Sequence, residues 1–84
     1  MEIIYTSHFK KAFKRLDKNL QKKAWGKLEL FKKDQFHSQL KTHKLEGTNY
    51  YSFSVTYKIR VIFQIIDKTT FLLNIGDHSV YREL

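Results

Sequence analysis

The strongest candidate for acting on a phosphate in this 84-residue chain is Arg60, a charged residue that interrupts the apolar run 59–63. An arginine buried there without a partner would be strongly destabilising, so its guanidinium must face solvent, an ion-pair partner or a ligand. A guanidinium is a rigid fork that fits a phosphate and stabilises the charge that develops on it. The plain alternative is an exposed or ion-paired surface arginine. Lys58 and Gln64, at the same period of two, add polar groups.

Two histidines could transfer protons beside such an arginine. His43 lies between Lys41 and Lys44, and His78 precedes Tyr81 by three positions. Cleavage of RNA through its 2′-hydroxyl needs a base, a cation for the pentacoordinate phosphate and an acid for the leaving oxygen. An imidazole, with a pKa of about 6.5, suits either proton role, and a tyrosine ring can stack on a nucleobase. Taken singly, each histidine is equally a surface residue and Tyr81 a ring packed on the core.

The first half of the chain predicts a short strand and two amphipathic helices. Residues 3–5 favour a strand, and the next two, Thr6 and Ser7, are good helix N-caps. Apolar residues then recur with helical spacing at Phe9, Ala12, Phe13 and Leu16. Asp17 or Asn19 can cap a second helix, whose apolar stripe is Leu20, Ala24, Leu28 and Phe31. Such close helices predict a hairpin that covers an apolar layer.

The second half predicts a meander of antiparallel strands. Apolar and polar residues alternate in 51–57, whereas 59–66 is almost continuously apolar, as in a central strand. A short turn precedes a third strand at 70–75. The segment 34–39 predicts a loop, and 40–45 can be extended.

These elements predict an α+β fold in one domain over residues 1–84. An N-terminal strand and a two-helix hairpin pack on a small antiparallel sheet of about four strands. The chain has no Cys, which excludes disulfides and thiolate metal sites and favours the cytoplasm. No segment approaches the roughly 20 apolar residues that span a bilayer, so we expect no membrane contact. No metal-ligand spacing appears, so we expect neither metal nor cofactor.

The charge of the chain is concentrated in its first half. Sixteen Lys and Arg against eight Asp and Glu give a net charge of +8. Residues 1–44 hold twelve bases and four acids, whereas residues 45–84 hold four of each. This asymmetry indicates a polyanionic partner, with lysines that merely solvate helix surfaces as the alternative.

Three segments resemble the RelE/ParE toxin superfamily. Residues 40–47 are similar to the family's L-K-x-H-x-L-x-G segment, 57–63 to a strand with a basic residue and an aliphatic run, and 73–81 to its closing element. The order of strand, two basic helices and meander agrees as well, so the resemblance covers essentially the whole chain. The superfamily contains ribosome-dependent mRNA endonucleases and gyrase inhibitors on one scaffold.

The resemblance to the nucleases implies a metal-independent endoribonuclease (mRNA interferase) that cleaves mRNA in the ribosomal A site. There the residue matching Arg60 stabilises the phosphate, the one matching His78 is acid or base, and the one matching Tyr81 positions the nucleobase. His43 matches a further histidine of the active surface, and which histidine is the base stays open. The phosphate contacts that we expect are Lys41, Lys44 and Lys58.

Two departures from relatives bear on the activity. RelE has lysines where this chain has Ser52 and Ser54, and relatives with a glutamate base carry it near Gln39. The proton-transfer candidates are therefore His43 and His78. The other functions compatible with the family are a ParE-like inhibitor of DNA gyrase and a relative that binds RNA or antitoxin without cutting. In each case the family implies a cognate antitoxin, acidic or amphipathic, that covers the basic surface.

Overall fold

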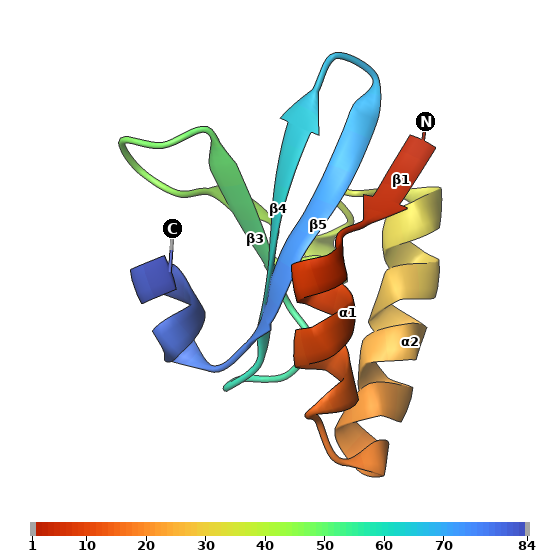
Figure 1. Ribbon diagram of the computed structural model, residues 1–84. Coiled ribbons are helices and arrows are strands. Elements are labelled where there is room, and N and C mark those ends of the chain that lie inside the picture. Colours follow the sequence, from red (N-terminus) through yellow and green to blue (C-terminus); the bar gives the residue numbers. More distant parts are fainter. Residues whose placement is uncertain (1, 84) are drawn as a thin grey trace.

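The computed structural model describes residues 2–83 and has an α+β fold, as predicted. In chain order the elements, η marking short 3₁₀ helices, are β1 (Glu2–Tyr5), α1 (Ser7–Lys14), α2 (Lys18–Lys33), η1 (Ser38–Leu40), β2 (His43–Lys44), β3 (Tyr50–Ser54), β4 (Arg60–Ile66), β5 (Thr69–Gly76) and η2 (His78–Glu83) (Figure 1). None of the helices within residues 2–83 has the length and apolar character needed to cross a bilayer.

The strands form one mixed sheet in the order β1-β5-β4-β3-β2. β1 joins an edge, as expected, but runs parallel to β5, so the sheet is not wholly antiparallel as predicted. The pairs β2–β3, β3–β4 and β4–β5 are antiparallel. The described sheet has five strands, so the expectation of about four was wrong. The additional strand is β2. Because β2 has only two residues, it is too short to produce an alternating pattern in the sequence.

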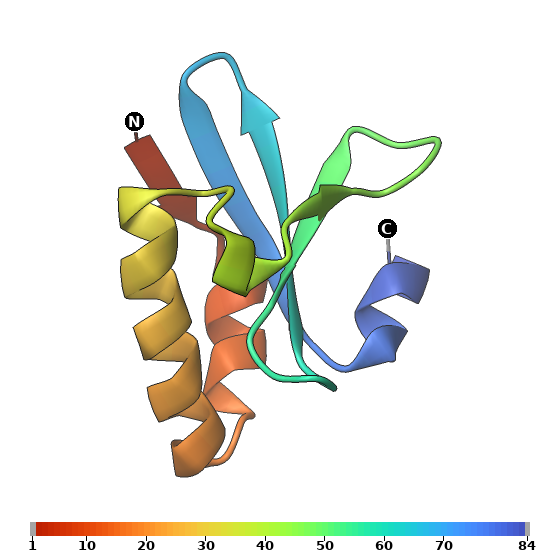
Figure 2. The ribbon, with the colours of Figure 1, turned by 180° about the vertical axis from the view of Figure 1, so that it is seen from behind.

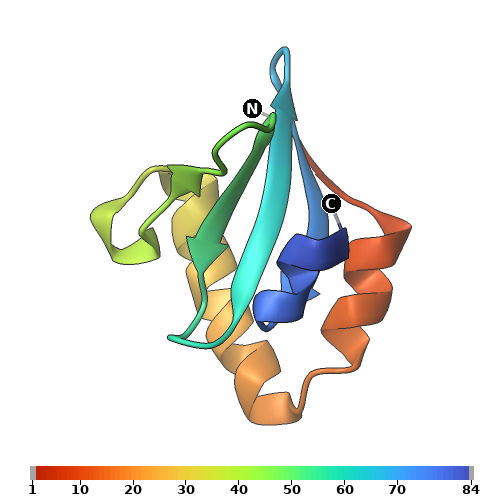
Figure 3. The ribbon, with the colours of Figure 1, turned by 90° about the vertical axis from the view of Figure 1, so that its left-hand side faces the viewer.

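The helices and the sheet form two layers. Figures 1 and 2 show α1 and α2 side by side on one face of the sheet, and Figure 3 shows η2 lying across the opposite face. Phe53, Val61 and Phe63 point toward the helices and belong to the core. We call the other face the open face, and its side chains on β3 to β5 include Ser52, Ser54, Arg60, Ile62 and Asn74.

Both helices begin at side-chain caps. Thr6 Oγ1 accepts the N–H of Phe9 at 3.2 Å and donates to the carbonyl of Leu72 at 2.7 Å, so the cap also ties α1 to β5. Asp17 Oδ1 accepts the N–H of Leu20 at 2.8 Å. Each cap satisfies a backbone donor that the first helical turn leaves without a partner.

The core lies between the helices and strands β3 to β5. Phe31 of α2 is at its centre, with its ring centroid 4.7 Å from that of Phe53 and 4.9 Å from that of Phe63. All three rings are fully buried, and Phe9 and Leu28 extend the cluster. The apolar stripes of both helices therefore face the sheet, as their spacing predicts.

Strand β3 ends three residues earlier than the alternating pattern predicts. The chain turns after Ser54, and Thr56 closes the turn by accepting the N–H of Ile59 on Oγ1 at 3.1 Å. Tyr57, which the alternation assigned to the strand, is 86% exposed in this turn. The local hydrogen bond of the threonine thus competes successfully with continued strand pairing.

Candidate functional site

The sheet register brings His43 onto the open face. Directly opposed residues of antiparallel strands carry their side chains on the same face. His43 is opposed to Ser52, Ser52 to Ile62, and Ile62 to Asn74, which gives one row across β2 to β5. His43, at the sheet edge, is exposed, whereas Ser52 and Ile62 are fully buried. Something must therefore cover the middle of this row.

The cover is η2, which lies across the open face (Figure 3). Val80 is 3% exposed, and a Cβ added at Gly76 would lie 2.9 Å from its Cγ1, so a glycine is needed for this close approach. The Tyr81 hydroxyl lies 3.4 Å from Ser52 Oγ. The rings of Tyr81 and His78 are 6.0 Å apart between centroids. Together these contacts place His78 and Tyr81 above the row that contains His43.

The hydrogen bond of His43 determines which of its ring nitrogens can take a proton. Nδ1 lies 3.2 Å from the carbonyl oxygen of Lys41. A carbonyl oxygen only accepts, so Nδ1 carries the proton in this hydrogen bond. In the neutral ring Nε2 is then the nitrogen with the lone pair. This tautomer suits a general base that faces solvent.

Arg60 lies on the open face one row away. It is opposed to Ser54, two residues from Ser52, which separates the rows by roughly 7 Å along the strands. Its Nη1 donates to the Thr56 carbonyl at 2.7 Å, and the remaining guanidinium donors can meet an anion. A neighbouring cavity of about 360 Å³ is lined by residues that include Lys27, Gln39, Lys41, Ser54, Tyr57 and Arg60.

Three lysines differ in their relation to this site. Lys41 follows η1 with a left-handed backbone, φ being 53°, and lines the Arg60 cavity. Lys44 is opposed to Tyr51, whose ring packs against the core, so Lys44 lies on the face opposite His43. Lys58 is exposed in the turn before β4 and is not among the residues that line the cavity.

Asp77 is an acidic residue beside His78 at the start of η2. Hydrogen bonds from Ser79 hold the pKa of its carboxyl below the ordinary value of 3.8, and the nearby charges of His78 and Arg82 add to the effect. Its Oδ1 accepts the Ser79 N–H at 2.9 Å at the start of η2. Asp77 therefore helps to fix the first turn of η2, which carries His78.

The structure brings most of the expected residues together and adds others. His43 lies on the open face opposite Ser52, Tyr81 contacts Ser52 from η2 and has the His78 ring beside it, while Arg60 and Lys41 share the adjoining cavity. The residues that the sequence did not single out for this site are Ser52, Lys27 and Tyr57. Alternation in β3 could have indicated the face of Ser52, but its long-range contact with η2 had no local signal. Across residues 2–83, no cluster of three or more His, Cys, Asp or Glu residues is arranged to hold a metal ion.

No model of a protein family and no curated protein sequence matches this chain. Solved structures resemble it over almost its full length. The YoeB/ParE toxin from Agrobacterium tumefaciens has a TM-score of 0.77 and 18% identity, and the match covers 93% of this chain and 99% of the toxin. The E. coli DinJ–YafQ toxin–antitoxin complex has a TM-score of 0.77 and 21% identity, and the match covers 94% of this chain and 93% of that chain. The RelB–RelE antitoxin–toxin complex from Methanococcus jannaschii has a TM-score of 0.78 and 17% identity, and the match covers 96% of this chain and 98% of that chain. At these identities the likeness concerns the fold, since one fold supports several activities.

Proposed function

We propose that this chain, which has the fold of the RelE/ParE toxin superfamily, is the toxin of a type II toxin–antitoxin system and an endoribonuclease that cleaves mRNA. The observation that supports this proposal most strongly is that His43, Arg60 and, through η2, His78 and Tyr81 all lie on the open face of the sheet, with Arg60 one row from the row of His43. Two proton-transfer groups and one cation are the minimum set for attack of a 2′-hydroxyl on the adjacent phosphate.

His43 is the base in the proposed reaction. Its Nε2 removes the proton from the 2′-hydroxyl, and Nδ1–H stays on the Lys41 carbonyl, which holds the ring in position. The 2′-oxygen then forms a bond to phosphorus while the bond to the 5′-oxygen breaks. The products are a 2′,3′-cyclic phosphate and a 5′-hydroxyl.

His78 is the acid, and Arg60 stabilises the phosphate. As an imidazolium, His78 gives its proton to the departing 5′-oxygen. Arg60 donates to the equatorial oxygens of the pentacoordinate phosphate, and Lys41 adds positive charge from the same cavity. Tyr81 stacks on the nucleobase beside the bond that is cut.

We further propose that the substrate is mRNA in the A site of a translating ribosome, which places the protein in the cytoplasm. Its cationic side chains favour an RNA-rich partner, and their attraction to phosphates accelerates association. The catalytic groups lie on the face of a sheet with His43 and His78 exposed to solvent. A ribosome that presents mRNA in an extended form would supply the orientation that such a face does not impose alone.

The decisive experiment is primer extension on mRNA in a reconstituted translation reaction. Wild-type protein is compared with Arg60→Ala, His43→Ala and His78→Ala, and circular dichroism verifies that each variant is folded. We expect cuts within the A-site codon, reduced about 10²–10⁴-fold by loss of either histidine. An mRNA with a 2′-deoxy nucleotide at the cut position should stay intact.

Lys68→Ala is the matched control for Arg60→Ala, because Lys68 is an exposed cation in the turn between β4 and β5. It should cut like the wild type. A folded wild-type protein that leaves mRNA intact would overturn the proposal. Inhibition of DNA supercoiling by that same protein would identify a gyrase inhibitor, and RNA binding without cleavage would identify a non-cutting relative.

We also propose that the antitoxin contacts a groove between α1 and α2. This groove, of about 440 Å³, is lined by Tyr5, Phe9, Phe13, Trp25 and Leu28, together with Lys10, Lys14 and Lys32. Trp25 is 49% exposed, and its ring centroid lies 5.5 Å from that of Phe13. An apolar floor beside three ammonium groups suits an amphipathic acidic segment of the antitoxin.

A further inference from the structure

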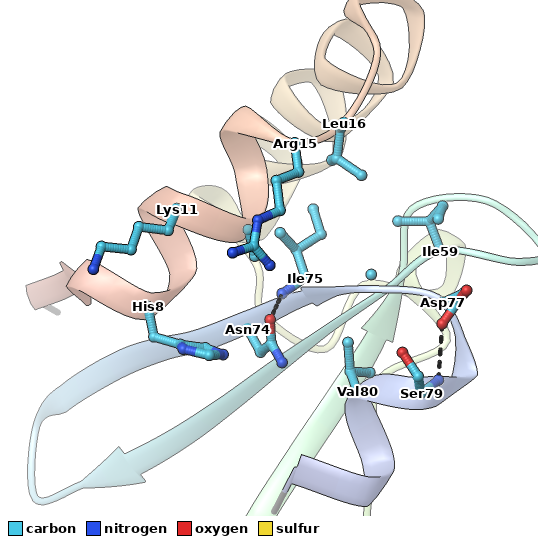
Figure 4. Close-up of a pocket in the computed structure, with 12 residues that line it drawn as sticks. His8, Lys11, Arg15, Leu16, Ile59, Asn74, Ile75, Asp77, Ser79 and Val80 are labelled. Atoms are coloured by element: carbon cyan, nitrogen blue, oxygen red, sulfur yellow. Dashed lines mark hydrogen bonds between the residues drawn. The ribbon is translucent and has the colours of Figure 1, made fainter.

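A second basic cavity lies on the other side of η2 from the catalytic face. It has a volume of about 340 Å³ and opens between α1 and η2, beside the end of β5 (Figure 4). Its polar lining includes His8 and Lys11 from α1, Arg15 at the C-terminal cap of α1, and Asn74, Asp77 and Ser79 from β5 and the segment that follows. None of the α1 residues belongs to the proposed catalytic site.

The cations of α1 fall on two sides of the helix. His8, Lys11 and Arg15 are three or four positions apart and share one side, which faces this cavity. Lys10 and Lys14 line the groove toward α2 instead. In Figure 4 the Arg15 guanidinium points into the cavity, and the His8 ring lies toward Asn74.

The acid in this cavity does not neutralise those cations. The Asp77 carboxylate accepts the Ser79 N–H at 2.9 Å, and the positive groups that act on it are His78 and Arg82. Among residues 2–82, whose side chains the structure describes, no ion pair of Lys11 or Arg15 with a carboxylate is found. Two positive side chains thus line a cavity whose acid is engaged by η2 itself.

The cavity and the catalytic face share η2 as their common wall. Ser79 faces the cavity, the buried Val80 packs on Gly76, and Tyr81 contacts Ser52 on the catalytic side. A nucleic acid chain that passes around η2 would meet both sites. The two sites are therefore suited to successive parts of one strand.

We infer that this cavity binds a phosphate of the RNA substrate other than the one that is cut. Arg15 is the principal ligand, Lys11 adds charge at the rim, and the Asn74 amide and the Ser79 hydroxyl border the site. The volume admits a phosphate with its ribose. The inference rests on the proposed nuclease function for the identity of the strand, and its test does not depend on cleavage.

The test uses the whole chain and two probes. Inorganic phosphate is titrated into ¹⁵N-labelled protein, and an RNA dodecamer with 2′-O-methyl groups throughout, which cannot be cut, is bound at several salt concentrations. We expect phosphate to shift the amides of Gly76 and Ser79 in the wild type and not in Arg15→Gln. The affinity for the dodecamer should fall about tenfold in Arg15→Gln. The slope of log Kd against log salt should decrease by about 0.7, the value for one phosphate of a single strand.

A second variant and a control keep the test independent of folding. Ser79→Glu adds a negative charge from the η2 wall and leaves α1 intact. It should weaken binding of the dodecamer as Arg15→Gln does. Lys68→Ala removes one exposed cation elsewhere and should keep the wild-type slope.

Equal slopes in Arg15→Gln and Lys68→Ala, or phosphate shifts confined to other amides, would refute the phosphate site. Shifts of these amides by polyglutamate but not by the dodecamer would refute it in favour of a protein partner. Cleavage of mRNA is scored separately, so failure of the nuclease proposal is distinguishable from failure of this one.

Discussion

The hydroxyl oxygens of Tyr81 and Ser52, 29 positions apart in the chain, lie 3.4 Å from each other. Ser52 is fully buried in β3, between β4 and β2, and Tyr81 comes from η2. Together with the packing of Val80 on Gly76, this contact holds η2 against the open face. The position of His78 therefore depends on a contact between residues that are not themselves acids or bases in the proposed reaction.

Tyr81→Phe should lower the free energy of unfolding by about 0.5–1 kcal/mol, because the ring remains while a long hydrogen bond to a buried hydroxyl is lost. Urea unfolding followed by circular dichroism measures the change. Tyr57→Phe is the matched control, since Tyr57 is 86% exposed, and it should be neutral. Equal stability of the two variants would mean that the hydroxyl contact does not hold η2.

Gly76→Ala should displace η2, because the added methyl would lie 2.9 Å from Val80 Cγ1. We expect a loss of about 1–3 kcal/mol in unfolding free energy, as for other overpacked sites, together with reduced cleavage. Gly26→Ala is the control. Gly26 lies in α2 with no atom within 4 Å of the added carbon, so alanine there should stabilise the protein by up to about 1 kcal/mol. Wild-type cleavage by Gly76→Ala would contradict the need for close packing of η2.

Phe31→Ala should be among the most destabilising single substitutions in this chain. Its ring contacts Phe53 and Phe63 at the centre of the core, and removal of such a ring costs about 3–5 kcal/mol. Thermal unfolding would show the variant largely unfolded at 37 °C if the domain has ordinary stability. Phe36→Ala, at a ring that is 56% exposed and packs edge-on against Tyr51, should cost less, about 0.5–1.5 kcal/mol.

Asp77→Ala should destabilise the protein at neutral pH and have less effect in acid. The folded state lowers the pKa of this carboxyl, so its contribution is present above the ordinary value of 3.8 and is lost as pH falls through the folded value. Urea midpoints of wild type and variant at pH 7 and pH 2 measure the difference. A difference that is the same at both pH values would contradict a role for the charged carboxylate at the start of η2.

Trp25 should report antitoxin binding through its fluorescence. It is the chain's single tryptophan and is 49% exposed in the groove between α1 and α2, so an apolar partner should shift its emission to shorter wavelength. Lys14→Glu, at the rim of the groove, should weaken that binding at least tenfold and leave mRNA cleavage by the free toxin unchanged. An unshifted emission maximum on antitoxin binding would show that the partner lies elsewhere.

Local sequence patterns were sufficient for most of the architecture. The helical spacing from Phe9 and the cap candidates Thr6 or Ser7 and Asp17 or Asn19 identified both helices, because these signals arise within one turn of the chain. The structure selects Thr6 and Asp17 as the caps. Alternation extended β3 too far, since the Thr56 side chain ends the strand by a hydrogen bond that periodicity does not reveal. The two-residue β2 was missed as a strand for lack of length.

The candidate site could be predicted from the sequence only in part, because it depends on the register in which the strands pair. That His43 and Lys44 lie on opposite faces follows from the pairing of β2 with β3, and a shift of one residue would exchange them. The meeting of Tyr81 with Ser52 joins segments whose separation no periodic pattern spans. The second basic cavity similarly needs α1 and η2 to be placed in space before its cations can be grouped.

The parallel pairing of β1 with β5 also has a kinetic consequence. Glu2 is opposed to Thr69, and the Thr6 hydroxyl bonds to Leu72, 66 positions away. Closing so long a loop is entropically expensive before any contact is gained, so this pairing should form late in folding. Strand β1 and helix α1 can acquire their partner in the sheet only after β5 has been synthesised. A ribosome making this protein would therefore carry an incompletely folded chain for most of translation.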